Sequence, residues 1–359
     1  MRESRIAAVL LVASAIAAAP APRRAQDESS TRYRLVSAES SDQLERRLRA
    51  AAEEGFELLA AAEGIDVAGK PRIAALMQRG AGGPVDYRVV ACSSVDDERA
   101  REVLAPLGEQ GYRLSPEAIT ARAMRDVNLP ESSYDDQLSL ILARHEDGAR
   151  FTFRALAFGD HEPFNRELAR LRGEGHEVLG MWNTGRKLEV ILQRRTDTTP
   201  VAAMRATVEH RLLLPSTRLV LGSQLESLAG QGFRILAAAE PSITGPPIVL
   251  LARTAVGGDI VDYKLLDDLP AKQTRDALAK KARKGWRVSR LGLTGEVVTL
   301  ERPARSSARS APAEYRLLSS RRAPGLELAL EESVSEGFEF VHLFVEPDET
   351  TVLVERPGR

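Results

Sequence analysis

The sequence predicts an α+β fold made of six tandem βαββ units. Each unit is expected to hold a small antiparallel or mixed three-stranded sheet with one helix, and the units are expected to pack in pairs. The first observation behind this prediction is a glycine that recurs every 52–64 residues and is always followed by a residue with a ring. The second is another ring residue 22 or 24 positions before each glycine, and the third is a leucine seven positions before it.

These three positions define the repeat. The glycines are Gly55, Gly111, Gly175, Gly232, Gly285 and Gly337, followed by Phe56, Tyr112, His176, Phe233, Trp286 and Phe338. The upstream ring residues are Tyr33, Tyr87, Phe153, His210, Tyr263 and Tyr315, and the leucines are Leu48, Leu104, Leu168, Leu225, Leu278 and Leu330. Because both ring positions of the third unit are altered, to Phe153 and His176, that unit departs most from the others.

Each unit begins with a strand at the upstream ring residue and continues into a helix. Apolar residues mostly stand three, four, seven and eleven positions before the glycine, which is the 3.6-residue period of a helix with one buried face. In the first unit Ser41 or Asp42 is expected to cap the helix. The glycine then ends it, because the residue after a helix often takes a positive φ that costs other residues about 1 kcal/mol.

Two strands are expected after the glycine. Phe56–Ala61 and Phe338–Val345 are rich in β-favouring residues, and each final strand ends in an arginine. In the sixth unit both alternating sets of residues of the second strand are apolar, and one helix covers only one face of a sheet. We therefore expect the units to associate in pairs through their sheets, with the helices outside. The final arginines are Arg79, Arg144, Arg194, Arg253, Arg302 and Arg356.

The pattern resembles a family of short βαββ domains of unknown function, numbered 4177. The fifth unit carries it with Tyr263-Lys264-Leu265 and Gly285-Trp286, and the sixth with Tyr315-Arg316-Leu317 and Gly337-Phe338-Glu339. The resemblance covers nearly the whole mature chain. It implies a fold and no reaction, because the shared motif is structural.

Linkers rich in small, polar or proline residues separate the units. The second unit also holds an insertion at 116–137 before its last strand, and long loops in compact domains are often functional. The expected divisions are a signal peptide and linker at 1–25 and repeats at 31–80, 85–145, 150–195, 207–254, 260–303 and 313–357.

The N-terminus predicts export. Arg2 and Arg5 precede the apolar run Ile6–Ala19, which is too short to span a bilayer, and small residues follow it as in a secretory signal peptide. Cleavage after Ala17, Ala19 or Ala25 stays open, and the alternative is a short membrane anchor left in place. We expect a periplasmic or extracellular protein without a transmembrane segment in the mature chain.

The charge and the histidines argue against several classes of site. The first 25 residues hold four arginines and one glutamate, so the net charge of −1 becomes −4 after their removal, which disfavours a nucleic-acid binder. None of the five histidines forms a helical pair with metal-ligand spacing, so no metal site is predicted. His176 and His210 occupy ring positions of the repeat, which favours a packing role. The other histidines are His145, His161 and His342, the last expected inside a second strand.

Nothing in the sequence matches a nucleophile motif. The chain has no Gly-x-Ser-x-Gly elbow, and the only cysteine, Cys92, is expected to be a buried or half-buried residue in or after a first strand. The acidic insertion residues Glu131, Asp135 and Asp136 lack the spacing of a calcium loop and favour a solvated hairpin. The final arginines favour a role in solubility over a row of anion sites.

The sequence therefore predicts no catalytic, cofactor-binding or metal-binding residue and no cofactor. We expect a secreted or periplasmic non-enzymatic repeat protein, a binding or scaffolding module of the cell envelope whose partner is another envelope protein or polymer. The alternative is a small-ligand-binding protein or hydrolase with a site grafted on the divergent second repeat. Unusual polar residues gathered in one unit would favour that alternative.

Overall fold

The computed structural model describes residues 31–80, 85–121, 138–183, 187–197, 208–239, 246–254, 261–266, 271–293, 298–303 and 312–358. The described elements all lie in one compact unit of the chain, Arg32–Arg359. The predicted signal peptide at 1–25 and residues 122–137 of the predicted insertion lie outside the described residues. The first part of the predicted insertion, 116–121, is not a loop as predicted but belongs to a strand that ends at Ala121.

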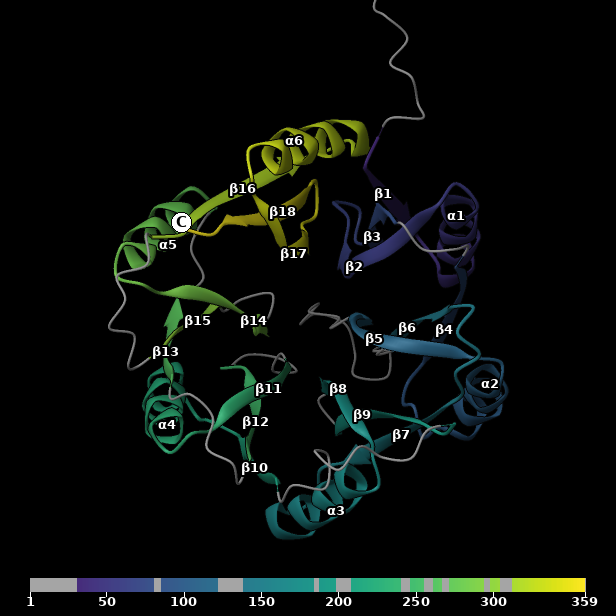
Figure 1. Ribbon diagram of the computed structural model, residues 1–359, viewed down its shortest axis with the longest axis vertical. Coiled ribbons are helices and arrows are strands. Elements are labelled where there is room, and N and C mark those ends of the chain that lie inside the picture. The colour runs from purple at the N-terminus through teal and green to yellow at the C-terminus, as the bar shows by residue number, and fades with distance from the viewer. Residues whose placement is uncertain are drawn as a thin grey trace, which may run out of the picture. The chain divides into compact units, whose positions relative to one another are not determined.

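Six groups of elements follow one another along the chain (Figure 1). The first three groups are β1 (Tyr33–Ala38), α1 (Ser41–Glu53), β2 (Phe56–Ile65) and β3 (Pro71–Arg79); β4 (Asp86–Cys92), α2 (Glu98–Glu109), β5 (Tyr112–Ala121) and β6 (Leu138–Arg144); β7 (Phe151–Ala157), α3 (His161–Gly173), β8 (Glu177–Asn183) and β9 (Leu188–Arg195). The last three are β10 (Val208–Leu213), α4 (Arg218–Gly230), β11 (Arg234–Ala239) and β12 (Ile248–Thr254); β13 (Val261–Leu266), α5 (Ala271–Ala282), β14 (Arg287–Leu293) and β15 (Val298–Pro303); β16 (Glu314–Ser320), α6 (Ala323–Ser335), β17 (Glu339–Val345) and β18 (Thr350–Arg356).

Each group forms a three-stranded antiparallel sheet in which the third strand lies between the first and the second. The α+β fold of repeated sheet and helix units is thus confirmed, and the sheets are antiparallel. A register shift interrupts every second strand after the third residue beyond the glycine, as between Leu58 and Ala60. Such a bulge turns one backbone N–H out of the ladder.

The helix ends follow the predicted chemistry. The six repeat glycines have φ between +78° and +94°, and no residue other than glycine has positive φ in the described part of the chain. In the fourth unit the N–H of Phe233 donates to the carbonyl of Leu228, the bond that closes a Schellman motif. At the other end of α1 the prediction was off by one residue, because Ser40 is the cap and accepts from the N–H of Gln43.

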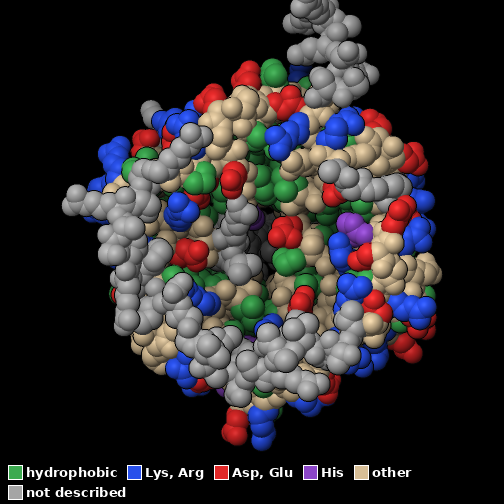
Figure 2. Space-filling view, in the orientation of Figure 1, with side chains coloured by type: hydrophobic (Ala, Val, Ile, Leu, Met, Phe, Trp, Pro, Cys, Tyr) green, Lys and Arg blue, Asp and Glu red, His purple; other side chains and the backbone are tan. Residues whose placement is uncertain are grey.

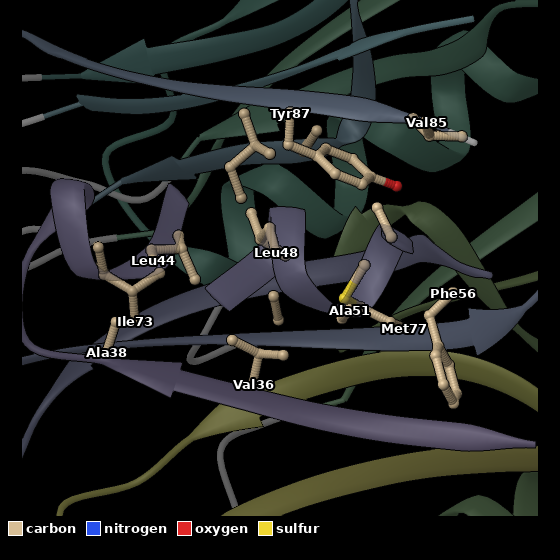
Figure 3. Packing of buried hydrophobic residues seen from close by; sticks show 14 residues of the cluster. Val36, Ala38, Leu44, Leu48, Ala51, Phe56, Ile73, Met77, Val85 and Tyr87 are labelled. Carbon is tan, nitrogen blue, oxygen red and sulfur yellow. The ribbon is translucent and has the colours of Figure 1, made fainter. Parts of the chain in front are cut away.

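The sheets do not pack in pairs, and this part of the prediction was wrong. One face of each sheet carries the helix of its own unit, and its other side contributes to the core formed around the helix of the preceding unit. Figure 3 shows this for α1, where Leu44 and Leu48 lie among Val36 and Met77 of the first sheet and Tyr87 of the next. Both sides of a sheet are buried by such head-to-tail packing, as its two-sided apolar strands require.

Within Arg32–Arg359 each unit contacts the next one along the chain, and the last unit contacts the first. Helix α6 packs against β1, and β17 contacts β2, so the sixth unit meets the first. A single core joins Leu326 and Leu330 of α6 to Tyr33 and Leu35 of β1. Glu327 accepts from the N–H of Leu35 at 2.7 Å, and a carboxylate so placed covers the edge of the sheet. We call this arrangement the closed ring of six units.

The second strands contact one another from unit to unit around the ring. β2 contacts β5, β5 contacts β8, β8 contacts β11, β11 contacts β14, and β14 contacts β17. A Cβ on Gly64 of β2 would lie 2.7 Å from the carbonyl oxygen of Val345 in β17, so the glycine permits the approach of the first and last units. Among the described helices, none is long and apolar enough to cross a membrane.

Candidate functional site

Three of the arginines near the ends of the third strands serve the fold. Arg356 pairs with Glu314 of the first strand, its Nη1 donates to the carbonyl of Glu336 at the helix end, and its guanidinium lies 4.8 Å from the ring of Phe338. Arg302 and Arg253 repeat all three contacts in the fifth and fourth units. Their predicted position at strand ends is confirmed, and their partners show a structural role: each ties the sheet to its helix.

The upstream tyrosines also have a structural role, between units. The N–H freed by the bulge donates to the tyrosine hydroxyl of the next unit, from Leu58 to Tyr87 at 2.7 Å, and the hydroxyl groups of Tyr263 and Tyr315 accept in the same way. In the third unit Phe153 has no hydroxyl, and Gln193 accepts from the N–H of Leu114 at 2.7 Å instead.

The larger of two pockets in the described part of the chain is built around a paired carboxylate. It has a volume of about 560 Å³ and lies between the first and second units. Asp86 sits in its wall and is held by Arg49 at 3.0 Å and Arg144 at 3.5 Å. The hydroxyl of Tyr112 donates to the same carboxylate at 2.5 Å. The carboxylate of Asp86 is therefore satisfied, whereas Glu53 and Glu146, which also line the pocket, form no ion pair among the described residues.

A second pocket, of about 390 Å³, lies mainly in the third unit and differs from the first in its polar groups. We call it the third-unit pocket. Its walls come from β7, from the second half of α3, from β9 and from the turn before α2. It is lined by Asp96, Thr152, Arg154, Ala155, Leu156, Glu167, Arg170, Leu171, Glu174, His176 and Arg194.

Three side chains of this pocket carry buried atoms without a hydrogen-bond partner in the described structure. They are Oδ1 of Asp96, Oγ1 of Thr152 and Nε of Arg194. A buried polar atom without a partner costs about 1–3 kcal/mol, so such atoms seldom gather without a reason. No other pocket described above concentrates them in this way.

His176 also lines the third-unit pocket, where four of the sister units have an aromatic ring without a ring nitrogen acceptor and the fifth has Trp286. It is 4% exposed, and its Nδ1 donates to the carbonyl of Leu171 at 3.1 Å, so the neutral ring carries its proton on Nδ1 and leaves Nε2 as an acceptor. Burial lowers the pKa of His176, and the nearby guanidinium groups of Arg194 and Arg154 lower it further. The imidazole is therefore neutral at pH 7.

The other histidines do not join this site. His210 is buried on β10, and neither ring nitrogen has a partner among the described residues. His342 lies on β17, as predicted, with its ring 4.6 Å from that of Phe344. His145 lines the larger pocket, and His161 stacks edge-on with Phe158 at 5.1 Å. Within the described residues, no three His, Cys, Asp or Glu side chains are placed to hold a metal ion.

Cys92 is a free thiol at the end of β4 and is half-buried, as predicted. Burial, together with the carboxylates of Glu189 and Asp97, raises its pKa to about 12. A thiol with so high a pKa is almost entirely protonated at pH 7 and is a poor nucleophile. Glu189 itself is buried and accepts from the hydroxyl of Ser94 at 2.9 Å.

The acidic insertion residues Glu131, Asp135 and Asp136 lie outside the described residues, so the structure does not place them. The unusual polar groups that it does bring together belong mainly to the third unit, and only Asp96 among them comes from the second. The repeat contained a signal for this site, because Thr152 stands where four other units have Asp or Glu before the upstream ring residue. Those acids are Asp86, Glu209, Asp262 and Glu314.

A comparison of the chain with protein-family models and with curated proteins found no match. The resemblance of the units to family 4177 stays a prediction.

Proposed function

We propose that this chain is an exported, non-enzymatic binding or scaffolding protein of the cell envelope. The observation that carries the proposal is the two-sided burial of the sheets in the closed ring. Burial of the sheet faces leaves helix surfaces and loops for recognition. Tandem-repeat proteins commonly bind large partners through such extended, varied surfaces.

The helix surfaces of the units differ in chemistry. Arg46, Arg47 and Arg49 are exposed on α1. At the start of α4, by contrast, Leu219 is 82% exposed and lies next to the partly exposed Val220. Surfaces so different suit one large partner with several contact regions better than six copies of one small ligand.

Charges of both signs are mixed over the face of the molecule seen in Figure 2. Most ion pairs among the described residues are exposed, as for Arg170 and Glu167, and such pairs stabilise the fold little. Mixed charge of this kind guides encounter and selects partners more than it adds affinity. We expect partner binding that weakens as salt increases.

The experiment is a pull-down from envelope extracts with the purified mature chain, at low and at high salt. Specific, salt-sensitive capture of one envelope protein or polymer supports the proposal. In parallel, fractionation is expected to find the chain outside the cytoplasm without its first segment. Hydrolysis of an ester, peptide or glycoside substrate by the purified chain would contradict a non-enzymatic role.

The alternative of a small-ligand site in one unit gains support from the third-unit pocket, which gathers buried polar atoms without partners. It supports a site formed mainly by the third unit, to which the second unit contributes Asp96. A binding protein with both an outer recognition surface and one small-ligand pocket is consistent with each observation.

A further inference from the structure

We propose that the third-unit pocket binds a small oxyanion that also carries a hydrogen-bond donor, such as a protonated phosphate group. The inference deepens the binding function proposed above and rests on it, but it concerns one pocket and not the outer surface. It follows from comparing three positions of the third unit, and the partners of their side chains, with the same positions in its sister units.

The first position concerns Arg194, the final arginine of the third unit. In four sister units this arginine pairs with an acid that precedes the upstream ring residue, as Arg302 does with Asp262 at 2.6 Å. The third unit has Thr152 at that position, paired across the strands with Arg194. Arg194 therefore lacks its carboxylate, and within the described residues it also lacks the helix-end carbonyl that accepts from Arg302.

The second position concerns Arg154, the residue after the upstream ring. In the sixth unit the equivalent Arg316 pairs with Glu336, directly before the repeat glycine, at 2.6 Å, and the first unit has the same pair. The third unit keeps the acid, Glu174, but its carboxylate is held by Arg170 of α3. No carboxylate among the described residues pairs with Arg154.

The third position is the ring between these two cations. In the first unit Phe56 lies between Arg34 at 4.4 Å and Arg79 at 4.6 Å, so the ring faces stabilise both guanidinium groups. The third unit has His176 there, a smaller ring that is neutral. Arg154, His176 and Arg194 all line the pocket of about 390 Å³, and no contact of either guanidinium group with an aromatic ring is found among the described residues.

The charges of the pocket define the class of ligand. Arg170 binds both Glu167 and Glu174, so these three groups together keep a net charge of −1, while Arg154, Arg194 and Asp96 form no ion pair among the described residues. Guanidinium groups bind phosphate and carboxylate oxygens in a forked geometry. Near them an ionised Asp96 repels an anion unless that anion donates a hydrogen bond to it.

Further polar groups fit the same ligand. The hydroxyl of Thr152 can donate or accept, and Nε2 of His176 accepts from a donor on the ligand. Phosphate at neutral pH keeps one or two protons, whereas sulfate has none. The pocket is therefore expected to prefer phosphate over sulfate.

The test is titration of the full mature chain with inorganic phosphate by calorimetry, at constant ionic strength set with chloride. Arg194→Gln is expected to weaken phosphate binding at least tenfold. Thr152→Asp restores the acid of the sister units and is expected to abolish binding without loss of fold, because the new carboxylate occupies Arg194. Arg166→Gln on the exposed side of α3 removes the same charge outside the pocket and serves as the control.

Sulfate and glycerol 3-phosphate complete the test. Sulfate is expected to bind at least tenfold more weakly than phosphate, and Asp96→Asn to reduce that difference. Binding of glycerol 3-phosphate as tight as that of phosphate assigns the pocket to a phosphoryl group carried on a larger molecule, and much weaker binding assigns it to the free ion. Either result supports the shared chemistry.

Two results would overturn the proposal. One is the absence of phosphate binding by a folded chain, and the other is binding that Thr152→Asp and Arg194→Gln leave unchanged. Equal affinity for sulfate would overturn the predicted hydrogen-bond donor and with it the ligand class. None of these outcomes bears on capture of a large partner, so the two proposals fail separately.

Discussion

The hydroxyl of Tyr87 accepts a hydrogen bond from the backbone N–H of Leu58 at 2.7 Å, although the two residues belong to different units. Leu58 is the last residue before the bulge of β2, and Tyr87 lies at the start of the next sheet. The bulge frees the donor and the tyrosine satisfies it. The recurrent tyrosine is thus a contact between units as well as a core residue.

Removing this hydroxyl tests the contact. Tyr87→Phe is expected to lower the free energy of unfolding by about 1–2 kcal/mol, because the N–H of Leu58 stays buried without an acceptor. Tyr33→Phe is the matched control, since no hydrogen bond to the hydroxyl of Tyr33 is found within the described residues, and it is expected to cost less. Denaturant unfolding of both variants measures the difference; equal losses would refute the role of the bond.

The helix-ending glycines give a second prediction. Gly285 has a φ of +78°, and a Cβ there would meet only the side chain of Arg302 at 3.6 Å, so the cost of Gly285→Ala is backbone strain of about 1 kcal/mol. Gly222 lies inside α4 in open space, and Gly222→Ala is expected to stabilise the helix by about 0.5–1 kcal/mol. Opposite signs in the shift of the denaturation midpoint are the expected result; a stabilising Gly285→Ala would contradict the role of the glycine.

Ring closure gives a third prediction. A circular permutant that joins Pro357 to Arg32 through a short linker, with new ends between the third and fourth units at 198–207, keeps every packed interface. It is expected to unfold cooperatively at nearly the same denaturant concentration as the parent chain. Deletion of 314–359 instead removes Leu330 and exposes Leu35 and the other residues of the first sheet that pack against α6.

The shortened chain is expected to self-associate or to unfold at lower denaturant concentration, because a large exposed apolar surface favours association. Size-exclusion chromatography and denaturant unfolding compare the circular permutant with the shortened chain. A deletion variant that stays monomeric with the stability of the parent would show that closure contributes nothing.

The fourth prediction concerns the loss of stability at acid pH that is caused by His210. Burial lowers the pKa of this side chain to about 4, and the neighbouring Arg172 adds to the effect. The unfolded chain, with an ordinary pKa near 6.5, then binds the proton at a higher pH than the folded chain. The contribution to stability is complete above about pH 6.5 and is lost as the pH falls toward 4.

Between pH 7.5 and pH 5 this side chain alone is expected to reduce the free energy of unfolding by about 2 kcal/mol. His210→Tyr, which introduces the residue of the sister units, should remove that part of the loss. Burial also lowers the pKa of His342 to about 4, so a slope is expected to remain in the variant. Identical pH dependence of the variant and the parent would rule out His210 as its source.

Sequence periodicity was sufficient for the number of units and for the elements of each. Leu48 with its apolar neighbours gives a helix face, Gly55 ends the helix, and Phe56 starts a strand, because these are local effects of backbone geometry and of one buried side. The two-sided apolar strands also showed that each sheet needed a second cover.

The tertiary structure alone decided what that cover is. A face-to-face pair and a head-to-tail ring bury the same alternating residues, so the pattern in Phe338–Val345 is the same for both. The candidate pocket depended equally on the fold. Thr152 is informative only because it lies opposite Arg194 on the neighbouring strand. Glu174 is informative only because its carboxylate pairs with Arg170. Such pairings join residues through space, and a single sequence does not contain the distances that select them.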